Sequence, residues 1–131
     1  MKMYYSNEAE EKLEAIKSDI RYCRERIATI RSTLARTNVQ LTHDRIQSSP
    51  NPNTMLDGII HIIELENELS KLAKEGIEFI GQLDSEQMRK VCVLFYIQEY
   101  KVCDIAERMK YSRWHIYRLL REATVKLSEP N

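Results

Sequence analysis

The chain has 131 residues, of which 43% are hydrophobic and 31% are charged, and its formal net charge is zero. This length allows one modest domain, or a small domain with a helical extension. Three glycines and three prolines are few, which favours long helices over a sheet with tight turns. Cys23, Cys92 and Cys103 are odd in number and lack C-x-x-C spacing, which disfavours disulfides and a paired-cysteine metal site. We therefore expect an all-α protein without metal or cofactor, in which Cys92 and Cys103 are small core residues.

The charge is distributed unevenly along the chain. Residues 57–86 contain eight acidic residues and two lysines, a net charge of −6, whereas residues 87–127 contain nine basic and four acidic residues, a net charge of +5. A polyanion responds to the local potential rather than to the charge of the whole chain. The C-terminal part is therefore expected to bind nucleic acid.

The N-terminal part carries a heptad seam. Apolar residues recur at alternating steps of three and four, and charged residues fill most positions between them, which predicts one long helix. The seam residues are Leu13, Ile16, Ile20, Cys23, Ile27, Ile30 and Leu34.

Two prolines in residues 48–53 predict a break after this helix. Asn53 or Thr54 can cap a second helix, whose heptad seam has Gly58 and Gly76 at two of its positions. Two seams joined by a short break predict a long antiparallel, coiled-coil-like hairpin over residues 1–83. The other seam residues are Met55, Ile62, Leu65, Leu69, Leu72, Phe79 and Leu83.

A second apolar stripe on this helix is more than a two-helix hairpin can cover. Either the C-terminal domain or another copy of the chain could bury it. We favour self-association, because a narrow hairpin has little core of its own. The stripe consists of Leu56, Ile59, Ile60 and Ile63.

Residues 84–131 are predicted to form a separate domain of three short helices, over residues 85–97, 101–109 and 112–127. Asp84 can cap the first helix, as in a capping box, and Ser112 can cap the last. The spacing of apolar and small residues in the last two helices is typical of a helix-turn-helix, with a small residue, Ala106, where the helices cross. Lys110 occupies a turn position that often holds glycine.

Helical geometry then leaves a basic and aromatic face outward on the last helix. Such a face can hydrogen-bond base edges and phosphates in the major groove. The alternative is a solvated face, with Trp114 packed on Tyr111 or on the hairpin. The predicted DNA-binding residues are Lys101, Lys110, Ser112, Arg113, Trp114, His115, Tyr117, Arg118 and Arg121.

Residues 83–127 resemble region 4 of sigma factors, most closely in LFYIQEYKVCDIAERMKYSRWHIYRLLREATVKL. With the long first helix, the SSPNPN break and the acidic second helix, the chain is similar to small transcriptional regulators of the ArpU/RinA type from phages and prophages of Gram-positive bacteria. That family usually has an arginine where this chain has Phe95. The resemblance implies activation of late phage genes by DNA binding near a promoter. Cysteines without a disulfide pattern fit the reducing cytoplasm of a bacterial cell, and the apolar stretches are too short to span a membrane.

No phosphate-binding loop, metalloprotease motif or nucleophile elbow occurs in the sequence, so we do not expect an enzyme. Three functions compete. The first is a DNA-binding regulator that acts as a homo-oligomer, and the second is a small terminase-like packaging protein, which a ring-shaped assembly would favour. The third is a protein-interaction module that docks on RNA polymerase or another protein, which an absence of DNA binding would favour.

Overall fold

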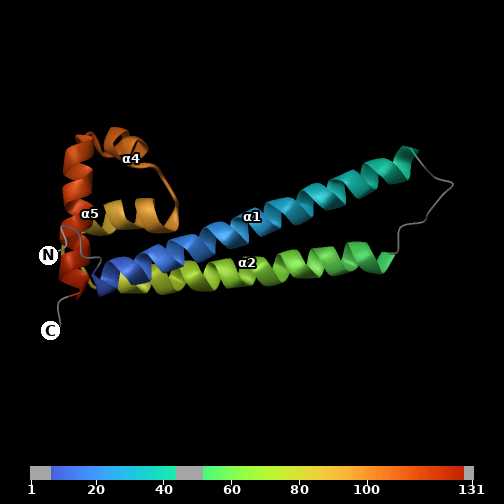
Figure 1. The fold of residues 1–131 in the computed structure, drawn as a ribbon, viewed down its shortest axis with the longest axis horizontal. Coiled ribbons are helices and arrows are strands. Elements are labelled where there is room, and N and C mark those ends of the chain that lie inside the picture. Colours follow the sequence, from blue (N-terminus) through green and yellow to red (C-terminus); the bar gives the residue numbers. More distant parts are fainter. Residues whose placement is uncertain (1–6, 44–51, 129–131) are drawn as a thin grey trace, which may run out of the picture. The chain divides into compact units, whose positions relative to one another are not determined.

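Figure 1 shows the fold in a computed structural model, which describes residues 7–43 and 52–128. These residues form helices and contain no strand, which confirms the all-α class. In chain order the elements are α1 (Glu8–His43), α2 (Pro52–Ile80), α3 (Glu86–Cys92), the π-helix η1 (Val93–Ile97), α4 (Val102–Met109) and α5 (Arg113–Ser128).

The described residues divide into two compact units. Unit 1 combines residues 7–20 with residues 72–128, and unit 2 comprises residues 21–43 and 52–71. This partition differs from the predicted domain boundary after residue 83. The reason is that the first turns of α1 and the last turns of α2 belong with the three C-terminal helices.

In unit 2, α1 and α2 run antiparallel (Figure 1). Arg31 Nη2 lies 2.8 Å from Glu66 Oε2, while a Cβ at Gly58 would lie 3.1 Å from Leu34 Cδ2. The later residue of α1, Leu34, thus meets the earlier residue of α2, Gly58, as antiparallel helices require. Among the side chains of this unit whose burial the structure describes, residues 21–36 and 55–71, the buried apolar ones are Cys23, Ile27 and Ile62.

Unit 1 has a core to which every α-helix contributes. α3 packs against α5, and α4 packs against both α5 and η1. Burial of such side chains is the main favourable contribution to folding, about 1.5–3 kcal/mol for each. Each α-helix contributes a fully buried residue, which in chain order are Leu13, Ile80, Val91, Ile105 and Ile116.

The start of α2 differs from the prediction. The helix begins at Pro52, so Asn53 and Thr54 lie inside the first turn and are not its cap. Proline is tolerated there because the first helical N–H groups have no intrahelical acceptor. The rest of the predicted break, residues 48–51, lies outside the described residues.

The cap of α3 is Ser85, and the prediction of Asp84 is wrong. Ser85 has extended backbone directly before Glu86, and its Oγ accepts a hydrogen bond from the Met88 N–H at 3.3 Å. Asp84 stands one residue too early for this bond. Its carbonyl instead accepts from Arg89 Nη1 at 3.1 Å.

The helix predicted over residues 85–97 changes to a π-helical turn at its C-terminal end. The Gln98 N–H donates to the Val93 carbonyl at 3.0 Å, five residues back, and α3 therefore continues into η1. Such single π turns often mark functional segments.

All three cysteines are free thiols. Cys92 is buried, as predicted, but Cys103 is exposed, so the prediction that it is a core residue is wrong. α4 buries Ile105 and Ala106, whereas Cys103 stands in the first turn of the helix and is open to solvent there.

Candidate nucleic-acid interface

The turn between α4 and α5 depends on a left-handed residue. Lys110 has φ 60° and ψ 43°, and the Tyr111 N–H donates to the Ala106 carbonyl at 2.9 Å. This arrangement ends α4 and satisfies one of its last carbonyls. Lysine pays about 1 kcal/mol for a conformation that glycine adopts freely.

Ser112 caps α5, as predicted. Its Oγ accepts a hydrogen bond from the His115 N–H at 3.1 Å, and its carbonyl accepts from the Ile116 N–H at 3.1 Å. The first turn of α5 is thereby fixed, and with it the direction in which the side chains of that turn project.

The crossing of α4 and α5 buries the small and apolar residues that the spacing predicted. Ala106 and Ile105 of α4 are buried, as are Ile116 and Leu119 of α5, and Met109 is half-buried. These contacts orient α5 on α4, so that the opposite face of α5 is open to solvent.

That open face carries cations and aromatic rings. Trp114 is 67% exposed and Tyr117 is 61% exposed, and Arg113, Arg118 and Arg121 are exposed. Trp114 is therefore not buried against Tyr111 or the hairpin, while the exposure of these five side chains fits a solvated face as well as a binding face.

His115 is the least exposed of the predicted contact residues on α5. It is half-buried, and its ring meets the Tyr111 ring edge-on with centroids 4.5 Å apart. Its side chain helps to hold the turn in place, so a contact with a partner depends on the exposed edge of the ring.

Arg118 is flanked by two side chains of its own helix. Its guanidinium carbon lies 5.5 Å from the centroid of the Trp114 ring, and its Nε lies 3.3 Å from Glu122 Oε2. Each partner is one helical turn away, which is the spacing at which side chains on a helix meet.

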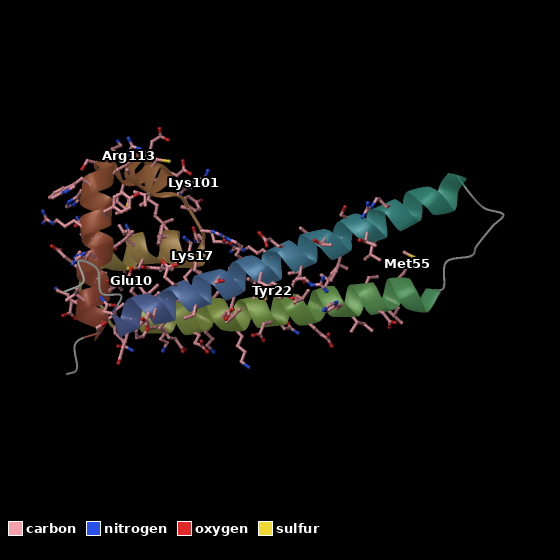
Figure 2. The ribbon with its side chains drawn as sticks, viewed as in Figure 1. Glu10, Lys17, Tyr22, Met55, Lys101 and Arg113 are labelled. Carbon is pink, nitrogen blue, oxygen red and sulfur yellow. The ribbon has the colours of Figure 1, made fainter. Side chains whose placement is uncertain are left out.

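Two further predicted cations precede α5. Lys101 and Lys110 are both exposed, and Figure 2 labels Lys101 just before α4 and Arg113 at the start of α5. Arg108 lies on α4, between these two lysines, and its guanidinium carbon is 4.7 Å from the centroid of the Tyr100 ring. Unit 1 therefore gathers basic side chains around the turn and the first turn of α5.

Unit 1 also has an apolar groove that no sequence pattern predicted. The groove has a volume of about 570 Å³ and draws its lining from α2, α3, η1 and α4. No periodicity within one helix could have revealed it. Its apolar lining is Ile77, Ile80, Val93, Leu94 and Met109, and its charged lining is Glu86, Arg89, Lys90 and Arg108.

Within residues 7–43 and 52–128, no group of three histidine, cysteine or carboxylate side chains is placed to hold a metal ion. None of the described helices combines the length and the apolar character that a membrane span requires. Comparison of the chain with protein families, with curated proteins and with solved structures gave no match.

Proposed function

We propose that the chain is a sequence-specific regulator of transcription that binds double-stranded DNA. The observation that carries this proposal is the open face of α5, which combines arginines and aromatic rings on a helix capped by Ser112. The major groove of B-DNA admits one α-helix, and the N-terminal turns of a recognition helix reach base edges there.

The side chains of the proposed interface fall into two groups, those assigned to base edges and those assigned to phosphates. Arg113, Arg118 and Tyr117 lie on the first two turns of α5 and are assigned to base edges, since arginine pairs bidentately with guanine. Lys101 and Lys110 are assigned to phosphates, which fix the position of a protein on DNA without reading sequence.

Three other residues support the same interface. Arg121 stands further along α5 and is assigned to a phosphate, while the exposed edge of His115 can donate to a phosphate or a base. Ser112 is engaged in capping α5, so its contribution is to orient the helix.

The biological role rests on the sequence resemblance to regulators of the ArpU/RinA type. We propose that the chain activates late genes of a phage or prophage in the bacterial cytoplasm. A helix that reads a defined site, on a chain with a separate helical unit, suits a protein that acts near a promoter.

Self-association belongs to the same proposal. The second apolar stripe of α2 lies in unit 2, and its four side chains, Leu56, Ile59, Ile60 and Ile63, are between 45% and 54% exposed. Contiguous exposed aliphatic residues of this size are typical of interfaces. A second copy of the chain would bury them and would place two recognition helices on one DNA site.

Binding to DNA in a salt series tests the function. Purified protein is titrated with duplexes from its own genomic neighbourhood and with an unrelated duplex of equal length. Tight, salt-sensitive binding that prefers one sequence is the expected result. Arg113→Ala and Arg118→Ala are each expected to cost about 1–3 kcal/mol on the preferred site. Equal losses on unrelated DNA would assign both arginines to phosphate, and no binding at low salt would refute the proposal.

A protein-interaction module is the second candidate, because the apolar groove, whose charged lining is three cations and Glu86, could receive an amphipathic segment of a partner with acidic residues beside its apolar face. Pull-down with purified RNA polymerase, using Val93→Glu as the groove variant, separates the two candidates. Polymerase binding lost in this variant, together with no DNA binding by the wild type, would favour the module. A ring-shaped oligomer seen by electron microscopy would instead favour the terminase-like alternative.

A further inference from the structure

Trp114 is unusual in its exposure. It is the only tryptophan of the chain, it stands in the first turn of α5, and 67% of it faces solvent. Tryptophan is highly buried on average in folded proteins. Its position beside Arg113, Tyr117 and Arg118 places this apolar surface within the proposed DNA interface.

Arg118 has two neighbouring side chains on its own helix. Its guanidinium carbon lies 5.5 Å from the centroid of the Trp114 ring, and the Glu122 carboxylate pairs with its Nε at 3.3 Å. This ion pair leaves the two terminal nitrogens to reach a partner. The planar guanidinium group presents these donors as a fork that can bond to two acceptors at once.

From this arrangement we infer that Trp114 and Arg118 read two adjacent base pairs as one unit: a guanine, and a thymine in the neighbouring pair. This inference rests on the proposed function. The guanidinium group bonds to O6 and N7 of guanine and lies in the plane of that base.

The Trp114 ring centroid lies 5.5 Å from the guanidinium carbon of Arg118, which is more than one base step of about 3.4 Å and less than two. The indole ring can therefore reach the level of the neighbouring base pair. The C5 methyl of thymine is the apolar group that the major groove presents at that level. The indole ring contacts this methyl, and the acidic partner Glu122 stays on the side of Arg118 away from the base.

Selection from a randomised duplex library tests the inference. Two base analogues are then placed in the selected site, one at a time. We expect a guanine with a thymine in the adjacent base pair. Replacing that guanine by 7-deazaguanine removes the N7 acceptor and is expected to weaken binding by about 5- to 150-fold. Replacing the thymine by deoxyuridine removes only the methyl group and is expected to weaken binding about fourfold.

Variants assign these effects to the two side chains. Trp114→Ala is expected to bind the thymine and deoxyuridine duplexes equally, while it still prefers guanine over 7-deazaguanine. Tyr22→Ala is the matched control, because Tyr22 is another exposed aromatic residue, on α1 and outside the interface, and it should keep the fourfold ratio. The fluorescence of the wild type, which has Trp114 as its one tryptophan, should change on binding of the selected duplex.

The outcomes separate this inference from the proposed function. A selected site without thymine beside guanine overturns the inference while DNA recognition stands, and so does an unchanged affinity for the deoxyuridine duplex. Equal binding to single strands would assign Trp114 to stacking on unpaired bases and would also overturn it. If the library yields no bound duplex at all, the proposed function fails and the inference fails with it.

Discussion

The ammonium nitrogen of Lys17 lies 3.8 Å from the centroid of the Phe95 ring, so α1 contacts η1 within unit 1. Lys12 makes the same kind of contact with Phe79, at 4.3 Å. A cation over an aromatic face contributes about 0.5–1 kcal/mol at an exposed site. The Phe95 ring of η1 therefore receives a cation from the first helix of the same chain.

The C-terminal 48 residues are consequently not expected to fold alone. Leu13 and Ile80 are buried in unit 1 and lie outside the predicted domain of residues 84–131. A fragment of those residues loses both side chains from its core, and deletions of this size cost about 2–5 kcal/mol each. Circular dichroism of the fragment should show a broad, weakly cooperative melt beside a cooperative melt of the full chain. Equal melting temperatures would contradict this prediction.

Local periodicity predicted much of the fold. The seam from Leu13 to Ile27 is buried, Ser112 caps α5, and the α4 to α5 crossing has the expected small residue, Ala106. These features depend on residues within a few turns of one another, where helical geometry leaves few arrangements.

The features that sequence reasoning missed depend on contacts between distant segments. The compact units join residues 7–20 to residues 72–128, and the apolar groove draws on several helices. The cap of α3 was missed for a local reason: the helix begins one residue later than predicted, so that Ser85 and not Asp84 precedes it. The Trp114, Arg118 and Glu122 set was visible as a four-residue spacing and could have been proposed from the sequence.

Stability is expected to fall at alkaline pH. Burial raises the pKa of the Cys92 thiol from its ordinary value of 9.0 to about 12. Burial, followed by the nearby Glu14 carboxylate, also raises the pKa of the Tyr96 hydroxyl. The unfolded chain therefore ionises first, so stability is complete below pH 9 and is lost progressively as the pH rises toward about 12.

Urea unfolding at a series of pH values checks this expectation. Cys92→Ala removes one of the two buried groups, so its free energy of unfolding should fall less steeply in the same pH window. Its lower stability at neutral pH is a separate effect of the smaller side chain. A wild-type stability that stays constant through this window would contradict the prediction.

The glycines of α2 should respond in opposite ways to alanine. Alanine is favoured over glycine in a helix by about 1 kcal/mol. At Gly58 the new methyl group would meet the half-exposed Leu34 side chain at 3.1 Å, and Leu34 can turn away. At Gly76 it would lie 2.5 Å from Ile97 Cδ1, inside a packed core where crowding costs about 1–3 kcal/mol. Urea unfolding should show Gly58→Ala as stabilising and Gly76→Ala as destabilising, and the reverse order would refute this account.

The apolar stripe of α2 is expected to control the oligomeric state. Ile63 is half exposed in unit 2, so Ile63→Lys should leave the helices folded while it places a charge in any interface that the stripe makes. Light scattering after size-exclusion chromatography should show oligomers for the wild type and monomers for Ile63→Lys. Ser70→Lys, another exposed position on α2, is the control and should remain oligomeric. A monomeric wild type would exclude self-association through the stripe.

Substitutions at Lys110 are expected to change the stability of the turn and the affinity for DNA independently. Its left-handed backbone, with φ 60°, costs about 1 kcal/mol that glycine avoids, so Lys110→Gly should stabilise the protein by about that amount. If the ammonium group contacts phosphate, the same variant should reduce the salt dependence of DNA binding by about one counterion, with similar losses on all duplexes. Lys110→Asn, which tolerates the left-handed region but has no charge, should show the same change in salt dependence. Loss of a phosphate contact always lowers the number of counterions that binding releases. A variant that is more stable but has an unchanged salt dependence would therefore support the left-handed turn and would show that Lys110 does not contact phosphate.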